Sequence, residues 1–450
     1  MIRKHIANHF ISMRHQGIDP IIKELKNTEF LEPTEIIKYQ NKKLQRLIDH
    51  AYHNVSYYKE LFDLHKIKPS HIKTANDLNV IPLLEKKTIQ ENTNSLIANN
   101  FTKYFTRTTS GSTGTPLNIH YNTENKLVEI ALMFRFLSSI GKDVGSKEIN
   151  LWGRPDNSTM NKLLRFTKGF LYNTSFKNVY QFKDQDYTDI VSSLIKNPNI
   201  HLRGFTQSIF MIACKLRDMK ASINIDAVSV TAEKLLSLQR EVIEKHLTKN
   251  LYDQYGCGET NSIAFECKCH NGLHHAFEHS ILEIVTDDGT RTNENGAAVI
   301  TNLDNYAMPL IRYRNGDLIR LSNKKCTCGR SSQLIDSIEG RLYDFIEGAN
   351  GVKVHNAFLD HILVESDILE QYKVNEIRII QTEPDLLVLQ YVSGIEIPVD
   401  NFDGFEREVK NHLGVMKINY MRKDFLKDTK NGKRRFVIPF HEYIKDKSIL

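Results

Sequence analysis

The sequence predicts an α/β fold in two domains. Its 450 residues exceed what a single hydrophobic core usually holds, so two or more domains are expected. Short apolar runs typical of strands alternate with segments of helical periodicity, which is the pattern of an α/β protein. Beyond about residue 345 this pattern restarts on a smaller scale, and no long linker precedes it. We therefore expect a large domain over residues 1–342 and a small domain over residues 343–450.

The large domain is expected to begin with helices and to continue with strands. Residues 1–95 are predicted to be helical, because apolar residues such as Leu44, Leu47 and Ile48 recur at near-helical spacing. A further helix is expected behind Thr123, a residue type that caps helix N-termini. Later strands are predicted at Val228–Val230, Ile281–Val285, Val299–Leu303 and Leu310–Tyr313.

The small domain is predicted to contain strands around one helix. Two apolar runs, Ile377–Ile380 and Leu386–Val392, are typical of strands. Apolar residues from Phe402 to Leu413 recur at helical spacing, and Phe436–Ile438 is expected to form a last short strand.

Composition excludes several classes of protein. Apolar residues make up 40% and charged residues 25% of the chain, which is ordinary for a globular protein. The net charge of +6 comes from Lys and Arg scattered among 54 acidic residues, so a nucleic-acid partner is not expected. No apolar run approaches the roughly 20 residues of a transmembrane helix. Polar residues such as Lys4 and Asn8 interrupt the N-terminus, so we expect no signal peptide and a cytoplasmic location.

The segment Thr108-Thr109-Ser110-Gly111-Ser112-Thr113-Gly114-Thr115-Pro116 is rich in hydroxyls and glycine. Glycines let the backbone approach a ligand closely, and consecutive backbone N–H groups together with hydroxyls can bind an anion. The segment is not a Walker loop, because no Gly-Lys-Ser or Gly-Lys-Thr ends it. It predicts a polyphosphate-binding loop, although flexible loops often share this composition.

Four further segments carry residues suited to nucleotide chemistry, although each alone could be an ordinary turn. Tyr252–Thr260 leads into a glycine-rich turn with Glu259, and a carboxylate beside phosphates is a good Mg²⁺ ligand. Ile311–Asp317 is expected to be a strand that ends in an Asn-Gly-Asp hairpin turn, from which Asp317 could chelate both ribose hydroxyls. The other two segments are Glu339–Asp344, at the expected domain junction, and Lys430–Arg435, a basic turn.

In order and spacing, these five segments resemble the motifs of the adenylate-forming superfamily of acyl-CoA synthetases and related ligases. The similarity extends from about residue 80 to about residue 440. Within the superfamily the chain resembles phenylacetate-CoA ligases and their relatives in capsular-polysaccharide gene clusters. These relatives share the forms Glu266-Cys267 … Asn271-Gly272-Leu273-His274 and Cys326-x-Cys328-Gly329-Arg330.

The resemblance implies a large AMP-binding domain and a small, mobile C-terminal lid domain that carries a catalytic lysine, Lys433. It also implies that ATP binds with Mg²⁺ and that Glu259 is both catalytic and a ligand of that ion. Thr231-Ala232-Glu233 is similar to the segment that packs on adenine. Nucleotide binding is implied for Thr109, Ser110, Gly111, Ser112, Thr113, Gly114, Ala232, Glu233, Tyr255, Gly256, Glu259, Thr260, Asp317 and Arg341.

The implied reaction joins a carboxylic acid to the α-phosphate of ATP, releasing pyrophosphate, before a nucleophile displaces AMP. The acceptor stays open between CoA and an amine or hydroxyl, because the loop that lines the thioester tunnel is not recognisable at residues 348–352. An alternative of another class is a non-catalytic nucleotide-binding or scaffold protein of a surface-polysaccharide pathway. The presence of Glu259, Asp317 and Lys433 favours the enzyme.

Four of the six cysteines form two Cys-x-Cys pairs, which in a cytosolic chain indicates a metal before a disulfide. Cys267, His274, Cys326 and Cys328 would give a Cys₃His tetrahedral set, typical of structural Zn²⁺. The close rivals as ligands are Cys269, His270 and His275.

Overall fold

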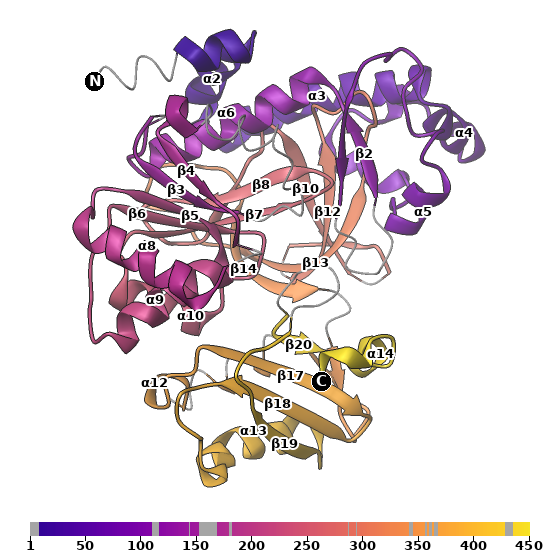
Figure 1. Ribbon diagram of the computed structural model, residues 1–450. Helices are drawn as coiled ribbons and strands as arrows, with labels where there is room; N and C mark the ends of the chain where they lie inside the picture. Colours follow the sequence, from indigo (N-terminus) through magenta and orange to yellow (C-terminus); the bar gives the residue numbers. More distant parts are fainter. Residues whose placement is uncertain are drawn as a thin grey trace. The chain divides into compact units, whose positions relative to one another are not determined.

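The computed structural model describes residues 9–109, 117–143, 145–152, 169–179, 182–286, 288–293, 295–341, 345–355, 358–359, 362–363, 368–427 and 435–450 (Figure 1). It confirms the predicted α/β class, with helices and strands alternating along the chain. Contacts between residues divide the chain into two compact units. The first contains Met1–Glu148, Ser158–Ser175 and Tyr252–Ile338, and the second Ile149–Asn157, Phe176–Leu251 and Glu339–Leu450. The predicted domain boundary at residue 342 stays a prediction.

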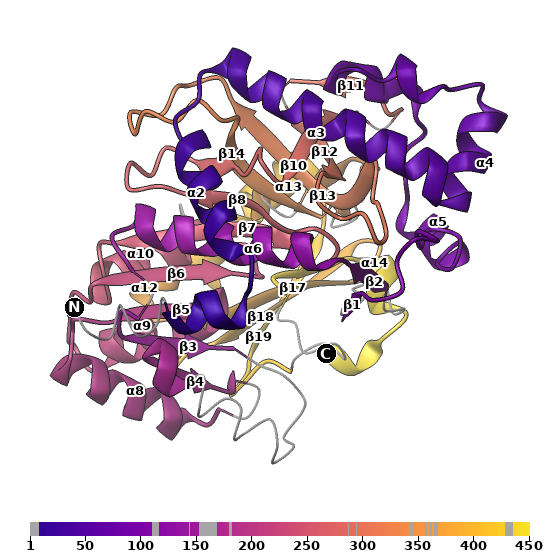
Figure 2. The same cartoon turned by 90° about the horizontal axis from the view of Figure 1, so that it is seen from above.

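Helices form the N-terminal part of the first unit, as predicted. They are α2 (Ile18–Thr28), α3 (Pro33–Asn54), α4 (Ser56–Leu64), α5 (Lys86–Glu91) and α6 (Thr123–Ser139), with short 3₁₀ turns at Pro69–His71 and Ala75–Val80. Helices α2 and α6 pack side by side (Figure 2). The cap expected at Thr123 was wrong by one residue: Thr123 is the first residue of α6, and Asn122 in extended conformation precedes it.

Antiparallel strands form the sheet of the first unit, in the order β11-β10-β12-β13-β14-β9-β8-β7. Their bounds are β7 (Leu251–Cys257), β8 (Asn261–Glu266), β9 (Leu273–His275), β10 (Ser280–Val285), β11 (Arg291–Thr292), β12 (Asn295–Asn302), β13 (Tyr313–Ser322) and β14 (Leu334–Arg341). A separate antiparallel pair joins β1 (Phe105–Thr108) to β2 (Asn118–Tyr121).

The strand predicted at Leu310–Tyr313 was wrong, because β13 begins at Tyr313. Arg312, just before it, has a left-handed backbone with φ of 53°, which an extended strand does not accommodate. The hairpin turn expected at Asn315–Asp317 was also wrong, since these residues lie inside β13. There the pairing with β12 shifts: Ala297 faces Leu318, whereas Val299 faces Arg314. The extra residues form a bulge.

The N-terminal part of the second unit contains strands in the order β6-β5-β3-β4, together with helices. The elements are β3 (Glu148–Leu151), β4 (Thr174–Lys177), α8 (Asp184–Lys196), β5 (His201–Phe205), α9 (Thr206–Asp218), β6 (Ala227–Thr231) and α10 (Ser237–His246). Strands β5 and β6 are parallel, and α9 packs on both. Strand β6 confirms the predicted strand at Val228–Val230.

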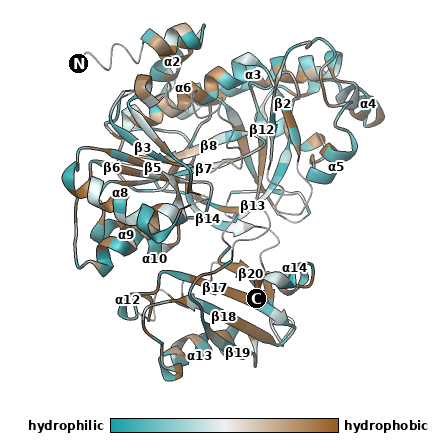
Figure 3. Ribbon diagram, viewed as in Figure 1, coloured by the Kyte–Doolittle hydropathy of each residue, from teal (hydrophilic) through white to brown (hydrophobic). Residues whose placement is uncertain are grey.

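The C-terminal part of the second unit forms a four-stranded sheet in the order β19-β18-β17-β20. The elements are β15 (Phe345–Glu347), β16 (Lys353–His355), α12 (Ile368–Gln371), β17 (Glu376–Glu383), β18 (Leu386–Val392), a 3₁₀ turn (Val399–Phe402), α13 (Asp403–Leu413), β19 (Lys417–Arg422), β20 (Val437–Ile438), α14 (Phe440–Tyr443) and a 3₁₀ turn (Lys447–Ile449). Central strands β17 and β18 are largely apolar (Figure 3), and the four elements predicted here, three strands and one helix, are confirmed.

Among the described residues, no helix combines the length and apolar character that crossing a bilayer requires.

A core in the first unit ties α4 to the segment that leads into β13. Tyr58 of α4 is 1% exposed and packs with Leu310, Ile311 and Tyr313. Its hydroxyl donates to the Pro309 carbonyl at 3.0 Å and accepts from the Ile311 N–H at 3.0 Å. One side chain therefore satisfies two buried backbone groups of the segment that leads into β13.

We predict that Tyr58→Phe lowers the free energy of unfolding by about 1–3 kcal/mol, because it leaves two buried backbone groups without a partner. The measurement is urea unfolding. The matched control is Tyr57→Phe, because Tyr57 is half-buried and its hydroxyl has no hydrogen-bond partner among the described residues. Equal stabilities of the two variants would contradict the prediction.

Candidate functional site

The Ser/Thr/Gly loop has a closed neck. Strands β1 and β2 pair up to Thr108 and Asn118, and the Thr109 N–H then donates to the Leu117 carbonyl at 2.8 Å. The Leu117 N–H in turn donates to Thr109 Oγ1 at 3.1 Å. Thr109 is 8% exposed, and its hydroxyl oxygen accepts a hydrogen bond from the backbone on the opposite side of the neck. Ser110, Gly111, Ser112, Thr113 and Gly114 lie outside the described residues.

The turn that carries Glu259 packs against this neck. A Cβ atom on Gly258 would lie 2.9 Å from Thr109 Cγ2, closer than carbon atoms approach, so the contact requires glycine. Arg107 of β1 donates from its guanidinium to the Gly258 carbonyl at 3.4 Å. The neck residue Thr109 and the turn, distant in sequence, therefore lie next to each other.

A buried carboxylate joins strand β1, which precedes the loop, to the turn. Glu129 of α6 is 6% exposed and pairs with Arg107, with an N–O distance of 2.6 Å. Asn125 donates to Glu129 Oε1 at 2.9 Å, and Asn261, just after the turn, donates to Oε2 at 2.8 Å. A buried carboxylate without partners would lower the stability of the fold. The contacts to Glu129 are therefore needed to keep its charge in the interior.

The predicted ribose ligand Asp317 is oriented by two neighbours. The Tyr255 hydroxyl donates to Asp317 Oδ2 at 2.9 Å, and the Asn315 amide donates to the same oxygen at 2.8 Å. Burial and the Asp317 carboxylate raise the pKa of Tyr255 well above its usual value, so the phenol remains a donor. Two motifs predicted to bind one nucleotide thus meet directly.

The bulge in β13 places this carboxylate. Gly316 has φ of 83°, a left-handed conformation that glycine adopts at little cost. The Asn315 side chain accepts from the Asp317 N–H at 3.0 Å and so closes the bulge locally. Bulges redirect side chains beside functional sites. The Asn-Gly pair therefore serves to orient Asp317 rather than to reverse the chain.

A histidine that the motifs did not identify contacts the other side of the Glu259 turn. His279 is fully buried, and its Nε2 lies 3.1 Å from the Thr260 carbonyl oxygen. Its Nδ1 lies 2.8 Å from Asp304 Oδ2. Burial opposes ionisation of Asp304, but Lys43 and His279 outweigh it and lower the pKa of that carboxyl.

Ala232 and Glu233, predicted to face adenine, follow β6 in the second unit. Ala232 has φ of 72°, unusual for alanine, and marks a sharp change of direction at the strand end. The Glu233 carboxylate accepts from the Gln207 N–H at 2.9 Å, and its carbonyl accepts from the Thr206 hydroxyl at 3.0 Å. These bonds fix the segment to the start of α9.

The remaining predicted site residues are placed as follows. Gly256 lies in β7 next to a shift in its pairing with β8. Arg341 is the last residue of β14, and its side chain is outside the described part of the chain. Lys433 also lies outside the described residues. Glu259 is half-exposed, and among the described residues no hydrogen bond or ion pair holds its carboxylate.

The four predicted metal ligands come together in the first unit. Ligand atoms of Cys267, His274, Cys326 and Cys328 all lie within 4.8 Å of one another. The two sulfurs of Cys267 and Cys326 are 3.5 Å apart, and Cys328 Sγ is 3.3 Å from His274 Nε2. Zn–S bonds of about 2.3 Å in a tetrahedron imply edges of about 3.8 Å, so the set fits zinc closely.

Sheet topology brings these ligands together. Cys267 follows β8, His274 lies in the adjacent β9, and both sulfurs of the second pair come from the loop between β13 and β14. The rival histidines have other partners: His270 bonds Glu266 at 2.9 Å and His275 bonds Ser280 at 2.9 Å.

The protonation states favour metal binding at two of the four ligands, His274 and Cys328, whereas burial raises the pKa of the Cys267 and Cys326 thiols, so a cation would have to displace their protons. Burial lowers the pKa of His274 to about 4, so its ring is neutral and able to coordinate at pH 7. Burial opposes ionisation of Cys328, but the N–H and guanidinium of Arg330 lower the pKa of its thiol. The other ring nitrogen of His274 contacts Ser332 Oγ at 3.3 Å, an outer contact that orients such ligands.

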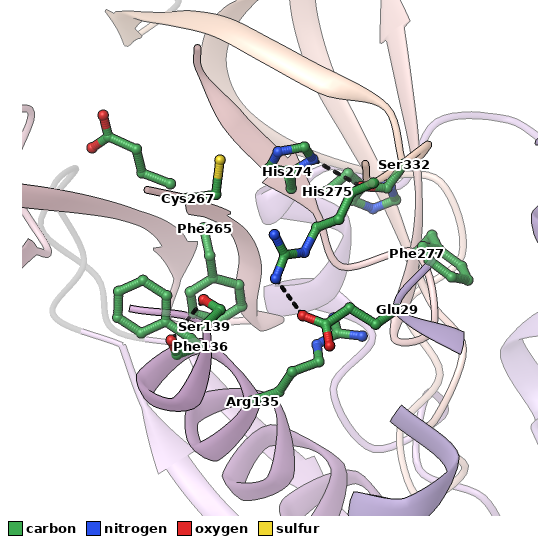
Figure 4. Close-up of a pocket in the computed structure, with 12 residues that line it drawn as sticks. Glu29, Arg135, Phe136, Ser139, Phe265, Cys267, His274, His275, Phe277 and Ser332 are labelled. Carbon is green, nitrogen blue, oxygen red and sulfur yellow. Dashed lines mark hydrogen bonds and ion pairs between the residues drawn. The ribbon is translucent and has the colours of Figure 1, made fainter. Parts of the chain in front are cut away.

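A cavity of about 30 Å³ adjoins the metal cluster (Figure 4). Its lining includes Cys267, His274 and Arg135, together with an ion pair between Arg330 and Glu29. The volume suits about one water molecule and is far too small for a nucleotide. This cavity therefore lies beside the four candidate metal ligands and is not of the size of a nucleotide site.

In fold, the chain is similar to adenylate-forming CoA ligases. It matches 2-hydroxyisobutyryl-CoA ligase in the postadenylation state, in complex with R3-HIB-AMP, with a TM-score of 0.74 and 16% identity over 94% of this chain and 93% of that one. No family model matches the chain.

In sequence, the chain is similar to Protein CapK of Staphylococcus aureus, with 23% identity over 417 residues and 90% of each chain covered. It is also similar to phenylacetate-coenzyme A ligase of Escherichia coli (strain K12), with 25% identity over 365 residues, 75% of this chain and 78% of that ligase. These similarities confirm the predicted resemblance and support an adenylate-forming ligase.

The geometry of the metal cluster predicts about one zinc per chain in protein purified without added metal, because one tetrahedral site is complete. Elemental analysis measures this content. The double variant Cys326→Ser/Cys328→Ser should lose the metal, whereas the control Cys269→Ser should keep it. Less than a tenth of one zinc in the native protein, or full zinc in the double variant, would contradict the assignment.

Proposed function

We propose that the chain activates a carboxylic acid as its acyl-adenylate, using ATP with Mg²⁺, and then transfers the acyl group to an acceptor. The observation that carries this proposal is the contact between predicted nucleotide motifs within the first unit. Asp317 is bonded by Tyr255, and the Glu259 turn touches Thr109. The relatives that are named CoA ligases support the same chemistry.

In the first step, a carboxylate oxygen of the acid attacks the α-phosphorus of ATP. The bond from that phosphorus to the oxygen bridging to the β-phosphate breaks, and pyrophosphate leaves. Mg²⁺, which Glu259 would hold, would neutralise phosphate charge when bound. Residues Thr109–Gly114 would hold the phosphates, Asp317 the ribose and Ala232–Glu233 the adenine.

Glu259 is the proposed ligand of Mg²⁺. Its carboxylate is half-exposed and has no partner among the described residues, so a cation can approach it. Mg²⁺ prefers one or two carboxylates together with phosphate oxygens. Thr260 and Gly256 flank the turn, and their proposed part is to shape it.

In the second step, an acceptor attacks the acyl carbonyl and AMP leaves. The proposed acceptor is the thiol of CoA, as the names of the relatives suggest, with an amine or hydroxyl of a surface-polysaccharide precursor as the alternative. Lys433 would serve the first step, and Arg341 would lie at the hinge about which the C-terminal lid moves. The retained Glu259 and Asp317 argue against a non-catalytic scaffold.

We also propose that Cys267, His274, Cys326 and Cys328 hold a structural Zn²⁺. All four tetrahedral positions would be filled by protein, which leaves no position for water or substrate. The site would fold the loop between β13 and β14 onto β8 and β9.

The proposed function is tested by pyrophosphate release from ATP and Mg²⁺ over aryl, fatty, amino and uronic acids, with and without CoA. We expect at least one acid class to release pyrophosphate, and Glu259→Gln to reduce this release strongly. Acceleration of AMP release by CoA would identify a thiol acceptor. Absence of acid-dependent pyrophosphate release across all classes would contradict the proposal.

A further prediction separates Lys433 from its basic neighbours. If Lys433 stabilises charge that develops at the α-phosphate, Lys433→Ala should slow adenylation on the order of 10²-fold or more, the effect of losing one transition-state donor. ATP binding should weaken much less. The matched control, Lys430→Ala, should be nearly silent. Equal losses for both variants would indicate a diffuse basic patch and contradict a specific role.

A further inference from the structure

The turn around Glu259 is held by side chains from outside the turn on both flanks. Arg107 donates to the carbonyl of Gly258, the residue before Glu259, at 3.4 Å. His279 contacts the carbonyl of Thr260, the residue after it, at 3.1 Å. The carbonyl groups of the two residues that flank Glu259 are therefore both anchored from outside the turn.

Both ring nitrogens of His279 lie within hydrogen-bond distance of oxygen atoms. Nδ1 faces the carboxylate of Asp304 at 2.8 Å, and Nε2 faces the Thr260 carbonyl. Asp304 is 1% exposed and is paired on its other oxygen by Lys43.

The two anchors belong to one buried network. The Asp304 N–H donates to Asn302 Oδ1 at 2.9 Å, and Asn302 Nδ2 donates to Asn125 Oδ1 at 3.0 Å. Asn125 donates in turn to Glu129, the partner of Arg107. A shift of one anchor would thus strain the other.

The turn needs such support because its backbone is unusual. Asn261, directly after Thr260, has φ of 57°, the left-handed region that few non-glycine residues occupy. Such conformations persist where surrounding bonds determine them. The Asn261 side chain is bonded to Glu129 at 2.8 Å, and the peptide group that precedes it is bonded to His279.

We propose that His279 is a positioning residue that acts through Thr260 to hold Glu259 in the geometry that binds a divalent cation. This inference rests on the proposed function, in which Glu259 takes Mg²⁺. Mg²⁺ demands near-ideal octahedral geometry, so displacement of one carboxylate weakens binding sharply. His279 touches neither the ion nor the nucleotide in this arrangement.

Two substitutions at this position separate the two bonds of the ring. His279→Gln places an amide N–H where Nε2 was, so it keeps the bond to Thr260 and loses the bond to Asp304. His279→Asn places its amide N–H where Nδ1 was, so it keeps Asp304 and loses Thr260. Each variant loses one of the two hydrogen bonds that the buried His279 ring makes, so the two variants form a matched pair.

The first measurement is backbone hydrogen exchange of peptides that contain Glu259, made without ATP or metal. His279→Asn should speed exchange in the turn at least severalfold relative to the native protein, whereas His279→Gln should change it little. Equal exchange in the two variants would overturn the inference. This readout stands even if the chain fails to activate any acid, so it is separate from the proposed function.

The second measurement is the Mg²⁺ concentration for half-maximal pyrophosphate release at saturating ATP. We expect about a tenfold increase for His279→Asn, the scale of one lost hydrogen bond, and less than threefold for His279→Gln. Thermal unfolding of both variants serves as the control for general destabilisation. Parallel losses of stability and Mg²⁺ response in both variants would show a structural role and overturn the proposal.

Discussion

The arrangement of the candidate site depends on one buried negative charge, that of Glu129. A carboxylate in the interior is tolerated when each oxygen is paired, and this pairing draws on Arg107, Asn125 and Asn261. The first belongs to the strand before the Ser/Thr/Gly loop and the last to the turn that carries Glu259. The hydrogen bonds and the ion pair of the Glu129 carboxylate therefore bring together two segments that the sequence separates by about 150 residues.

Preorganisation is the common theme of this half of the site. Asp317 is aimed by a bulge and held by two donors, and the Glu259 turn is bonded on both flanks. Groups fixed before a substrate arrives need little reorganisation during reaction, which is how polar sites stabilise developing charge most effectively. Glu259 itself is the exception, with a half-exposed carboxylate surrounded by a rigid frame. That contrast is expected for a ligand that must meet an incoming ion.

The sequence predicted what periodicity and motif order encode. The alternation of strands and helices predicted the fold class. The two Cys-x-Cys pairs predicted the cluster of four candidate metal ligands that contains Cys267. The hairpin turn was predicted wrongly because the Asn315-Gly316 pair is compatible with a hairpin turn and with a bulge. The pairing with β12 decides between these two structures. The partners of Glu129 and His279 were not predicted, because most of them lie many residues away in the sequence. The spacing of residues within one helix or strand carries no information about such contacts. Neither residue stands out among the other glutamates and histidines.

The first unit is interrupted in sequence, since residues 1–148 and 252–338 build it together. Its long-range bonds, such as Thr28 to Glu278, join positions 250 residues apart. At synthesis rates of about 5–20 residues per second, tens of seconds pass between the synthesis of the N-terminal helices and that of the segments, 250 residues later, on which they pack. During that interval the apolar faces of these helices are uncovered, as in other topologies with distant contacts. The helical segment is consequently open to aggregation or to capture by chaperones during this interval.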